Sequence, residues 1–264
     1  MKMLPPQPGT LAVLLASATL GVLPGRAGLL VVPDAHATIQ AAIDAARPGD
    51  HVVVKAGTYR ERLRLKPGLT VRSAGGDDRG ERGLKRAEET VIDGGGVLPE
   101  GAGARPGVAM AEGATLDGFT VTRVGRYDEE RWKKHHATRG DEQHHEHIGG
   151  FGSPGIGADG VNCTIVNNIV HHNGHTGIAL RGAEGKHIAP VVRSNISCRN
   201  MGGGIGIMHG ASGVVSGNAC FENFHAGIGH SGASPLVEDN DCHGNIRAGI
   251  GISEGACPVV RRNK

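Results

Sequence analysis

Four stretches of the chain follow one pattern: NNIVHHNGHTGIAL (167–180), SNISCRNMGGGIGI (194–207), GNACFENFHAGIGH (217–230) and DNDCHGNIRAGIGI (239–252). Each has Asn at its second and seventh positions and a Gly-Ile pair at its eleventh and twelfth. Sequence similarity that returns every 20–50 residues is typical of a solenoid, in which equivalent segments stack on one another. The pattern therefore predicts a stack of coils over the C-terminal half.

The repeat extends beyond these stretches and can be written as columns of equivalent residues. The first Asn column recurs at intervals of 27, 23, 22 and 23 residues, and the extra residues of the longest interval are accounted for by the insertion AEGKH (183–187). The columns are Asn168, Asn195, Asn218, Asn240 and Asn263; Asn173, Asn200, Asn223 and Asn245; Ile165, Val192, Val215, Val237 and Val260; and the Gly-Ile pairs at 177–178, 204–205, 227–228 and 249–250.

A coil of 22–23 residues suits three short strands, each pairing with its equivalent in the next coil at ~4.8 Å. We expect the Asn columns at the tight bends, because Asn tolerates left-handed backbone and its amide can bond along the stack. The columns expected to point inward are the Val/Ile column, both Asn columns, the Ile of each Gly-Ile pair, Val170/Ser197/Cys220/Cys242 and Leu180/Ile207/His230/Ile252.

The five cysteines are expected to be small apolar core residues. Cys220 and Cys242 occupy one column in adjacent coils, so their thiols point the same way, and we expect no disulfide between them. His230 falls in an inward column and is expected to be a core histidine with its hydrogen bonds satisfied.

The N-terminal part combines one helix with short strands. Thr38 can cap a helix whose apolar residues Ile39, Ala42, Ile43 and Ala46 have helical spacing, and Pro48-Gly49 ends it. Strands are expected at 29–32, 51–55, 63–65, 69–71 and 90–92, another coil at 114–121, and a loop at 97–113.

The stretch TIQAAIDAA (38–46), GDHVVVKAGTYRERL (49–63) and VIDGGG (91–96) resembles the N-terminal cap and first coils of the pectate-lyase-like β-helix superfamily. The resemblance covers about sixty residues and implies an all-β, single-stranded, right-handed parallel β-helix with a short N-terminal capping helix. The superfamily includes polysaccharide lyases, pectin methylesterases and polygalacturonases.

The catalytic motifs of these enzymes have no counterpart here. None of Gln7, Gln40 and Gln143 is followed by Asp, as methylesterase motifs require, and the columns lack the Asp cluster of polygalacturonases. Only Glu238, Asp239 and Asp241 hint at the acidic group of calcium-dependent pectate lyases. GTYRERL resembles a methylesterase segment but also serves as first-coil structure, so we assign it no catalytic role.

Residues 1–27 are expected to be a signal peptide. Lys2 precedes the apolar run TLAVLLASATLGVL (10–23), and Gly25 and Ala27 give a cleavage site. The run is shorter than the ~20 residues that span a bilayer, so we expect no stable membrane span and a secreted, periplasmic or cell-surface protein. Residues 28–113 then form the cap and first coils, and 114–264 the repeats, with a His-rich insertion at 124–155.

Composition argues against some partners. Gly makes up 45 of 264 residues, aromatic residues only 3%, and the formal net charge is +2. Because no basic stripe is interleaved with aromatic residues, we expect no nucleic-acid partner. The last residues, PVVRRNK (258–264), begin a coil without completing it, and we expect either a truncated gene product or an oligomer or partner that covers this open end.

The insertion is the first candidate site, since eight of the fifteen histidines lie between His135 and His175. His145 and His147 alternate around Glu146, an arrangement that chelates metals. With His171, His172 and His175 they are the candidate ligands of a divalent metal, zinc or copper, with calcium a poorer match and no other cofactor expected. The alternative is a solvated polar loop.

The second candidate is a stripe of polar residues beside the coils. The column of His175 continues with Gly202, His225 and Arg247, and that of His172 with Arg199 and Glu222. The insertion can fold back over this stripe. Ala179, Gly206, Gly229 and Gly251 should point outward next to it, leaving a bare sheet face that needs a covering loop or a flat ligand such as a sugar chain.

The leading hypothesis is an exported protein that binds or processes a polysaccharide. If it is an enzyme, which the sequence leaves open, it would be a lyase or hydrolase, with His175 or His225 as base and Arg247 or Arg199 neutralising a carboxylate or enolate. The alternatives are a metal-handling periplasmic protein and a non-enzymatic surface scaffold.

Overall fold

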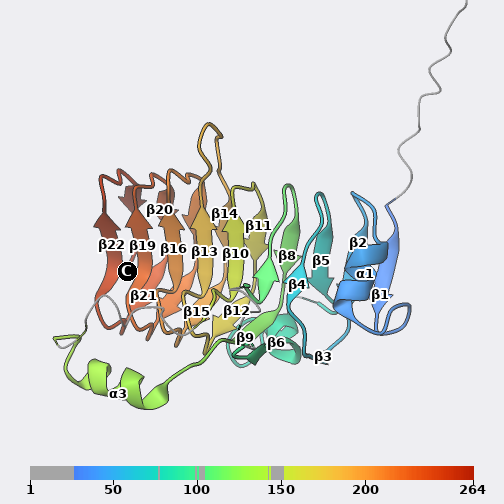
Figure 1. Ribbon diagram of the computed structural model, residues 1–264, viewed down its shortest axis with the longest axis horizontal. Helices are drawn as coiled ribbons and strands as arrows, with labels where there is room; N and C mark the ends of the chain where they lie inside the picture. The colour runs from blue at the N-terminus through green and yellow to red at the C-terminus, as the bar shows by residue number, and fades with distance from the viewer. Residues whose placement is uncertain (1–26, 77, 99, 101–104, 142, 144–151) are drawn as a thin grey trace, which may run out of the picture.

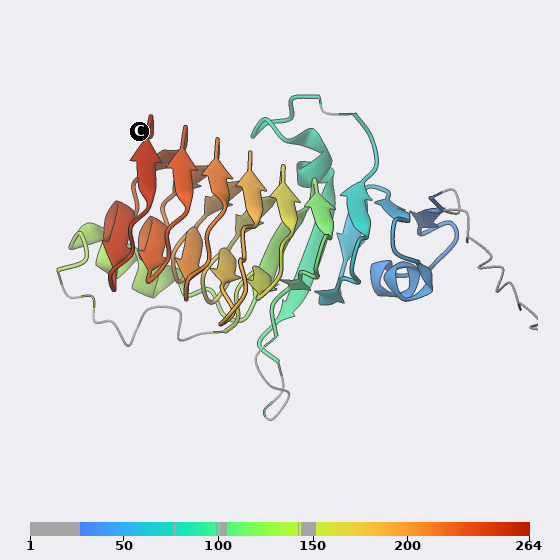
Figure 2. The ribbon, with the colours of Figure 1, turned by 90° about the horizontal axis from the view of Figure 1, so that it is seen from above.

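The computed structural model describes residues 27–264, except 77, 99, 101–104, 142 and 144–151. The strands of this described part form three parallel sheets, named here A, B and C, that wind around one core (Figures 1 and 2). In each coil the chain passes through sheet A, then B, then C, and returns to A one layer further along. The prediction of an all-β parallel β-helix is confirmed.

The strands follow one another along each sheet. Among the described residues, sheet A contains β1 (Leu29–Val32), β2 (His51–Val54), β5 (Thr70–Ser73), β8 (Thr115–Asp117), β11 (Thr164–Val166), β14 (Val191–Arg193), β17 (Val214–Ser216), β20 (Leu236–Glu238) and β23 (Val259–Arg261). Sheet B contains β3 (Gly57–Tyr59), β6 (Thr90–Gly96), β9 (Thr120–Val124), β12 (Ile169–His171), β15 (Ile196–Cys198), β18 (Ala219–Phe221) and β21 (Asp241–His243). Sheet C contains β4 (Leu63–Arg64), β7 (Val108–Ala109), β10 (Ile156–Asp159), β13 (Ile178–Arg181), β16 (Ile205–Met208), β19 (Ala226–Ser231) and β22 (Ala248–Ser253).

The expected inward columns build the core. In sheet A, Val71, Leu116, Ile165, Val192, Val215 and Val237 are paired in register and fully buried or nearly so. In sheet C the same holds for Ile156, Ile178, Ile205 and Ile228. Because the apolar side chains of every coil stack on those of the next, burial is continuous along the axis and each coil depends on its neighbours.

The Asn columns form two buried ladders of hydrogen bonds. Asn195 Nδ2 donates to the carbonyl of Ile165 at 2.9 Å and to Asn218 Oδ1 at 3.0 Å, and its backbone N–H donates to the same Oδ1 at 2.9 Å. Asn218 repeats this arrangement one coil further, with Val192 and Asn240. Each amide thus satisfies the backbone groups left over where the chain turns from sheet A to sheet B.

One detail of the Asn prediction was wrong. The left-handed backbone at the first bend belongs to the residue before each ladder Asn, as in Asn167, Ser194 and Asp239, with φ of 56°, 56° and 57°. The ladder position needs a side chain that both donates and accepts hydrogen bonds across the coils. The residue before it, not the ladder Asn, adopts the left-handed backbone conformation. Asn is therefore selected for its amide and not for its backbone tolerance.

The second ladder explains the Gly of each Gly-Ile pair. A Cβ built on Gly177 would lie 2.8 Å from Asn200 Nδ2, and one on Gly204 would lie 2.8 Å from Asn223 Nδ2. Such contacts leave no room for any side chain. The Gly column therefore follows from the Asn column at the same corner, between sheets B and C.

A helix closes the N-terminal end, as expected. α1 (Ile39–Ala45) is capped by Thr38, whose side chain accepts from the amide of Ala41, and it covers the first coil (Figure 1). The Glu61 carboxylate accepts from the amides of Ile39 and Gln40 at 2.9 Å each. Glu61 of the GTYRERL segment therefore fixes the start of the helix.

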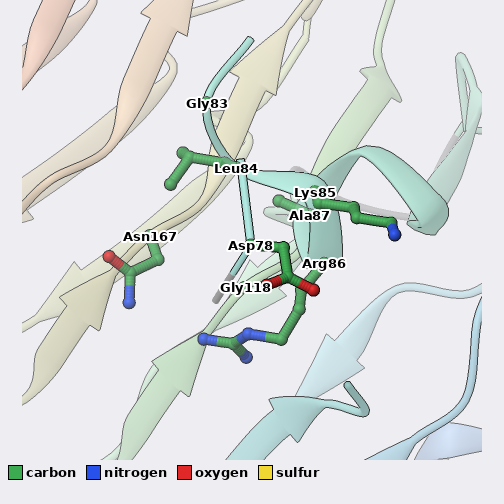
Figure 3. A pocket seen from close by; sticks show the side chains of 8 residues that line it. All are labelled: Asp78, Gly83, Leu84, Lys85, Arg86, Ala87, Gly118 and Asn167. Atoms are coloured by element: carbon green, nitrogen blue, oxygen red, sulfur yellow. The ribbon is translucent and has the colours of Figure 1, made fainter. Parts of the chain in front are cut away.

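Three elements differ from the expectation. The predicted loop at 97–113 contains β7, because Val108 continues an inward column of sheet C. Two helices were not predicted, α2 (Lys85–Glu89) and α3 (Glu129–Ala137). The α2 segment is fixed by Arg86, which donates to Ser73 and to Asp117 Oδ1, beside a cavity of about 220 Å³ (Figure 3).

The cysteines are free, and Cys220 and Cys242 stack in register as expected. The core expectation is wrong for Cys257, which is exposed, whereas Cys198 is buried although it lies outside the inward column of sheet B. His230 is only 2% exposed and bonds Gly251 O through Nδ1, but its Nε2 has no partner within the described residues.

At the C-terminal end, Ile252, Val259 and Val260 are exposed. The partner or second copy expected over this coil stays a prediction. None of the helices in the described part is long and apolar enough to cross a membrane.

Replacing Asn218 with Ala tests the first ladder. The change leaves buried backbone groups of two neighbouring coils without partners, at about 1–3 kcal/mol for each group. We expect a loss of about 3 kcal/mol in the free energy of unfolding, measured by denaturant titration. Ser216→Ala, on the outward face of the same coil, should cost less than about 0.5 kcal/mol. Equal costs for the two variants would contradict the role of the ladder.

Candidate functional site

The predicted stripe lies at the corner between sheets B and C and divides into two lines. The line nearer sheet B consists of left-handed residues, Arg123, His172, Arg199 and Glu222, with φ between 53° and 57°. The line nearer sheet C consists of His175, Gly202, His225 and Arg247, which lead into the strands of that sheet. The two lines have different surroundings.

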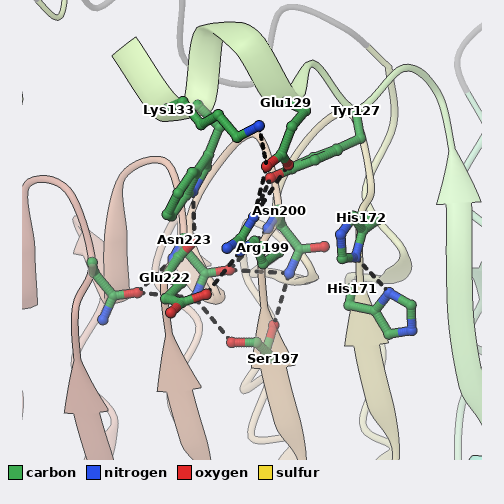
Figure 4. A network of polar contacts seen from close by, with 12 residues as sticks. Tyr127, Glu129, Lys133, His171, His172, Ser197, Arg199, Asn200, Glu222 and Asn223 are labelled. Atoms are coloured by element: carbon green, nitrogen blue, oxygen red, sulfur yellow. Dashed lines mark hydrogen bonds and ion pairs between the residues drawn. The ribbon is translucent and has the colours of Figure 1, made fainter. Parts of the chain in front are cut away.

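The line nearer sheet B is covered by the insertion. Arg199 bonds Glu222 Oε2 at 2.8 Å through Nε, and Glu129 of α3 at 3.1 Å through Nη1 (Figure 4). The carbon of its guanidinium group lies 4.0 Å from the centre of the Trp132 ring, and Tyr127 Oη lies 3.5 Å from Nη1. Partly buried ion pairs and cation–π contacts of this kind contribute roughly 1 kcal/mol each. Arg199 thus joins the insertion to the coils.

Apolar contacts complete this junction. Trp132 packs with Met201, Phe224 and Ile246, which are equivalent residues in successive coils. The indole Nε1 also donates to the carbonyl of Glu222 at 2.8 Å. The part of the insertion that the structure describes therefore lies over the His172 line, as the topology of the sequence suggested.

His171 and His172 form a pair beside this junction. Their Nδ1 atoms are 2.8 Å apart, so one ring must donate and the other accept. Burial, and then the charges of His172 and Arg82, lower the pKa of His171 to about 4. Burial and the charge of Arg199 also lower the pKa of His172. Both rings are therefore neutral at pH 7.

The line nearer sheet C borders a shallow groove. A cavity of about 420 Å³ lies on the outer face of this sheet, and His175, Asp159 and Arg181 are among the residues around it. Its floor includes the outward residues Gly157 and Ala179. The same outward column continues, paired in register, through Gly206, Gly229 and Gly251. The sequence predicted this strip of small residues, which runs along the axis for about 19 Å at the spacing of parallel strands.

His175 has a defined hydrogen-bonding state. The amide of Thr176 donates to its Nδ1 at 2.7 Å, so the neutral ring carries its proton on Nε2. Burial and then the charge of Arg181 lower the pKa of this imidazole. At pH 7 His175 therefore offers a hydrogen-bond donor, whereas the sequence hypothesis gave it the role of a base.

His225 and Arg247 lie further along the same edge. The Arg247 amide bonds the His225 carbonyl, and Arg247 Nη2 donates to the carbonyl of Gln143, just beyond α3, at 3.2 Å. The structure thus places His175, His225 and Arg247 along one edge of sheet C, and Arg199 apart from them under α3.

Sequence reasoning missed Asp159 and Arg181. They are outward residues two positions beyond the strip of small residues, and their strands pair Asp159 with Arg181 in register. The alternation of a strand would have placed them outside. Nothing in the sequence marked them as neighbours of His175.

The candidate metal ligands are only partly described. His145 and His147 lie outside the described residues. Within the part that is described, no three His, Cys, Asp or Glu side chains lie close enough together to hold a metal ion, so His171, His172 and His175 do not form a three-ligand site there. The metal hypothesis stays a prediction.

Known proteins share the fold. The family described as "Right handed beta helix region" matches residues 145–264. An alginate lyase from Paenibacillus sp. str. FPU-7 superposes with a TM-score of 0.57 and 17% identity over 85% of this chain and 72% of its own. Pectate lyase Pel9A gives 0.55 and 18% identity, over 87% of this chain but only 56% of its own. No curated protein sequence matches the chain.

These comparisons confirm the right-handed parallel β-helix that the N-terminal resemblance implied. At such identities the likeness concerns the fold. The chain also spans little more than half of the pectate lyase.

The His171 pKa predicts acid sensitivity. Its folded pKa of about 4 lies below the ordinary value of about 6.5, so the neutral ring stabilises the fold above pH 6.5, and this stability is lost as the pH falls towards 4. Between pH 7 and pH 4.5, we expect the melting temperature of His171→Gln to fall by less than that of the wild type. His187→Gln, at an exposed turn, should behave as the wild type. An unchanged acid loss in His171→Gln would refute the assignment.

Proposed function

We propose that this chain is an exported protein that binds an acidic polysaccharide along the outer face of sheet C and cleaves it by elimination or hydrolysis. The observation that carries the proposal is the groove on that face. It has a floor without side-chain bulk and ionisable residues along both edges. A flat sugar ring can lie against such a floor, because the residues of the strip itself are no larger than Ala.

The charges at the edges favour a carboxylated sugar. Arg181 and Arg247 are both exposed, one on each side of the strip, while Asp159 is the acidic residue that lines the cavity. The planar guanidinium group binds a carboxylate through two parallel hydrogen bonds. An uronate chain would thus meet a cation at either edge.

The same residues suggest a division of roles. His175 offers its Nε2–H to a sugar oxygen, and the proposal gives the role of proton acceptor to His225, the next histidine along that edge. Arg181 or Arg247 would neutralise the carboxylate of the sugar beside it, whose charge spreads onto the ring as an α-proton leaves. Arg199 is already held by two carboxylates and an indole ring, so the proposal gives it no contact with the sugar.

Two of the structurally similar proteins are named as lyases of alginate and of pectate, and these two polymers are the first probes. Binding to each is measured by calorimetry. Cleavage is followed by the ultraviolet absorbance of unsaturated uronates and by a reducing-end assay, which separates elimination from hydrolysis.

We expect Arg181→Gln to weaken binding of the preferred polymer by about tenfold, because one charge-assisted contact is worth about 1.4 kcal/mol. Arg193→Gln, an exposed arginine on sheet A, is the matched control and should bind as the wild type. If the wild type binds neither these nor other uronate polymers, the proposed function is wrong. If the wild type binds a polymer but releases no cleavage product, the protein binds the polysaccharide and does not cleave it.

His225→Gln tests the proton acceptor. We expect product formation to fall at least about a hundredfold while binding changes little, because general base catalysis contributes 10²–10⁴-fold. Unchanged turnover would remove His225 from the proposal.

Export rests on residues 1–27, of which 1–26 lie outside the described part of the chain. We expect the protein produced in a bacterial host to be recovered outside the cytoplasm with Gly28 as its first residue, determined by N-terminal sequencing. Leu14→Arg, which interrupts the apolar run, should keep the chain in the cytoplasm. Recovery of cytoplasmic wild-type protein beginning at Met1 or Lys2 would contradict export.

A further inference from the structure

The insertion contacts one edge of sheet C at two places. Gly152, Ser153 and Pro154 line the cavity together with His175. Further along the edge, a Cβ on Gly140 would lie 3.0 Å from Ile246 Cγ2 and 3.7 Å from Arg247 Cδ. The insertion is therefore part of the edge that carries His175 and Arg247.

Gln143, in the middle of the insertion, is tied to this edge by hydrogen bonds. Gln143 Nε2 donates to the carbonyl of Phe224, and the Gln143 carbonyl accepts from Arg247 Nη2 at 3.2 Å. The position of the exposed Arg247 side chain thus depends on where Gly140 and Gln143 lie. Both residues follow α3 closely, so their place depends on how α3 docks.

Arg199 is the polar centre of that docking. Its guanidinium fork divides between Glu222 of the coil, at 2.8 Å, and Glu129 of α3, at 3.1 Å, while its face lies under Trp132 at 4.0 Å. A lysine ammonium could keep one ion pair but not the fork and the flat stack together. Without Arg199, Glu129 and Glu222 would face each other across the junction as like charges.

We infer that Arg199 is a positioning residue for the proposed binding face: it holds α3 on the coils, and through Gly140 and Gln143 it fixes Arg247 at the edge where the uronate lies. This rests on the proposed function. Arg199 acts without touching the sugar, by removing the need to order Arg247 and its support when the polymer binds. Ordering one such side chain costs about 0.5–1.5 kcal/mol.

The chain contains a built-in reporter of this docking. Trp132 is its single tryptophan, lies on α3 and is only 5% exposed. Its fluorescence therefore reports the junction alone. Release of α3 would shift the emission to longer wavelength and raise quenching by acrylamide several-fold.

The test compares Arg199→Gln and Arg199→Lys with Arg261→Gln. The control breaks a similar pair between coils, because Arg261 Nε bonds Glu238 Oε2 at 2.8 Å on sheet A. We expect Arg199→Gln to shift the emission and weaken polysaccharide binding by about tenfold, with Arg199→Lys in between. The control should match the wild type in both.

Hydrogen exchange supplies a readout that needs no polysaccharide. In Arg199→Gln, amides at 139–143 and at 246–248 should exchange faster, while those of β14 stay unchanged. Glu129→Gln, a substitution on the outer helix that leaves the coils intact, should give the same changes to a smaller extent. Glu129→Gln therefore tests the inference even if Arg199→Gln fails to fold.

The outcomes separate the two ideas. If the wild type binds no uronate polymer, the proposed function fails and with it the effect on affinity, whereas fluorescence and exchange still decide whether Arg199 positions the edge. If affinity falls only in step with the melting temperature and the Trp132 emission stays unchanged, Arg199 has a general structural role and the inference is overturned. Faster exchange at 139–143 but not at 246–248 would also overturn it.

Discussion

The buried asparagine ladders are the constraint on which this structure depends. A coil that turns between short strands leaves backbone donors and acceptors in the interior, where each unpaired group costs about 1–3 kcal/mol. One amide per corner satisfies them, by donating to the carbonyl of the preceding coil and accepting from its amide. These hydrogen bonds can form only when the Asn of one coil lies over the Asn of the next, so they fix the register of the coils. The register in turn determines which residues form each column on the surface.

The shape of sheet C follows from the same constraint. The second ladder fills the corner between sheets B and C, so the residue that enters each strand must be Gly. With the following outward positions also small, the face stays flat, and the insertion is left to supply its edge. The three elements of the candidate site therefore have different origins: the floor comes from small outward residues two positions beyond each corner Gly, the charges from other outward positions, and the wall from α3 and its flanks.

Much of the fold could be predicted because equivalent residues recur at regular intervals along this one sequence. The inward positions, the capping helix and the outward strip all follow from spacing. The site was harder, because its contacts join distant segments. Glu129 meets Arg199 from 70 residues away, and Trp132 meets the Glu222 carbonyl from 90. The repeat pattern gives no sign of such contacts, so the sequence suggested that Arg199 was available to bind a substrate carboxylate. The state of His175 was equally hidden, since it depends on one bond from Thr176.

The central claim is that a polymer lies along the strip of small residues on sheet C, and filling that strip tests it most directly. A Cβ on the outward Gly229 would meet its nearest atom, Ala226 Cβ, only at 3.9 Å, so the backbone there has room for a side chain, and Gly229→Phe is the variant of choice. Phe also suits a strand. The account predicts an unchanged melting temperature and a loss of uronate binding in this variant, measured against the wild type by calorimetry. Full affinity in a folded Gly229→Phe protein would contradict it.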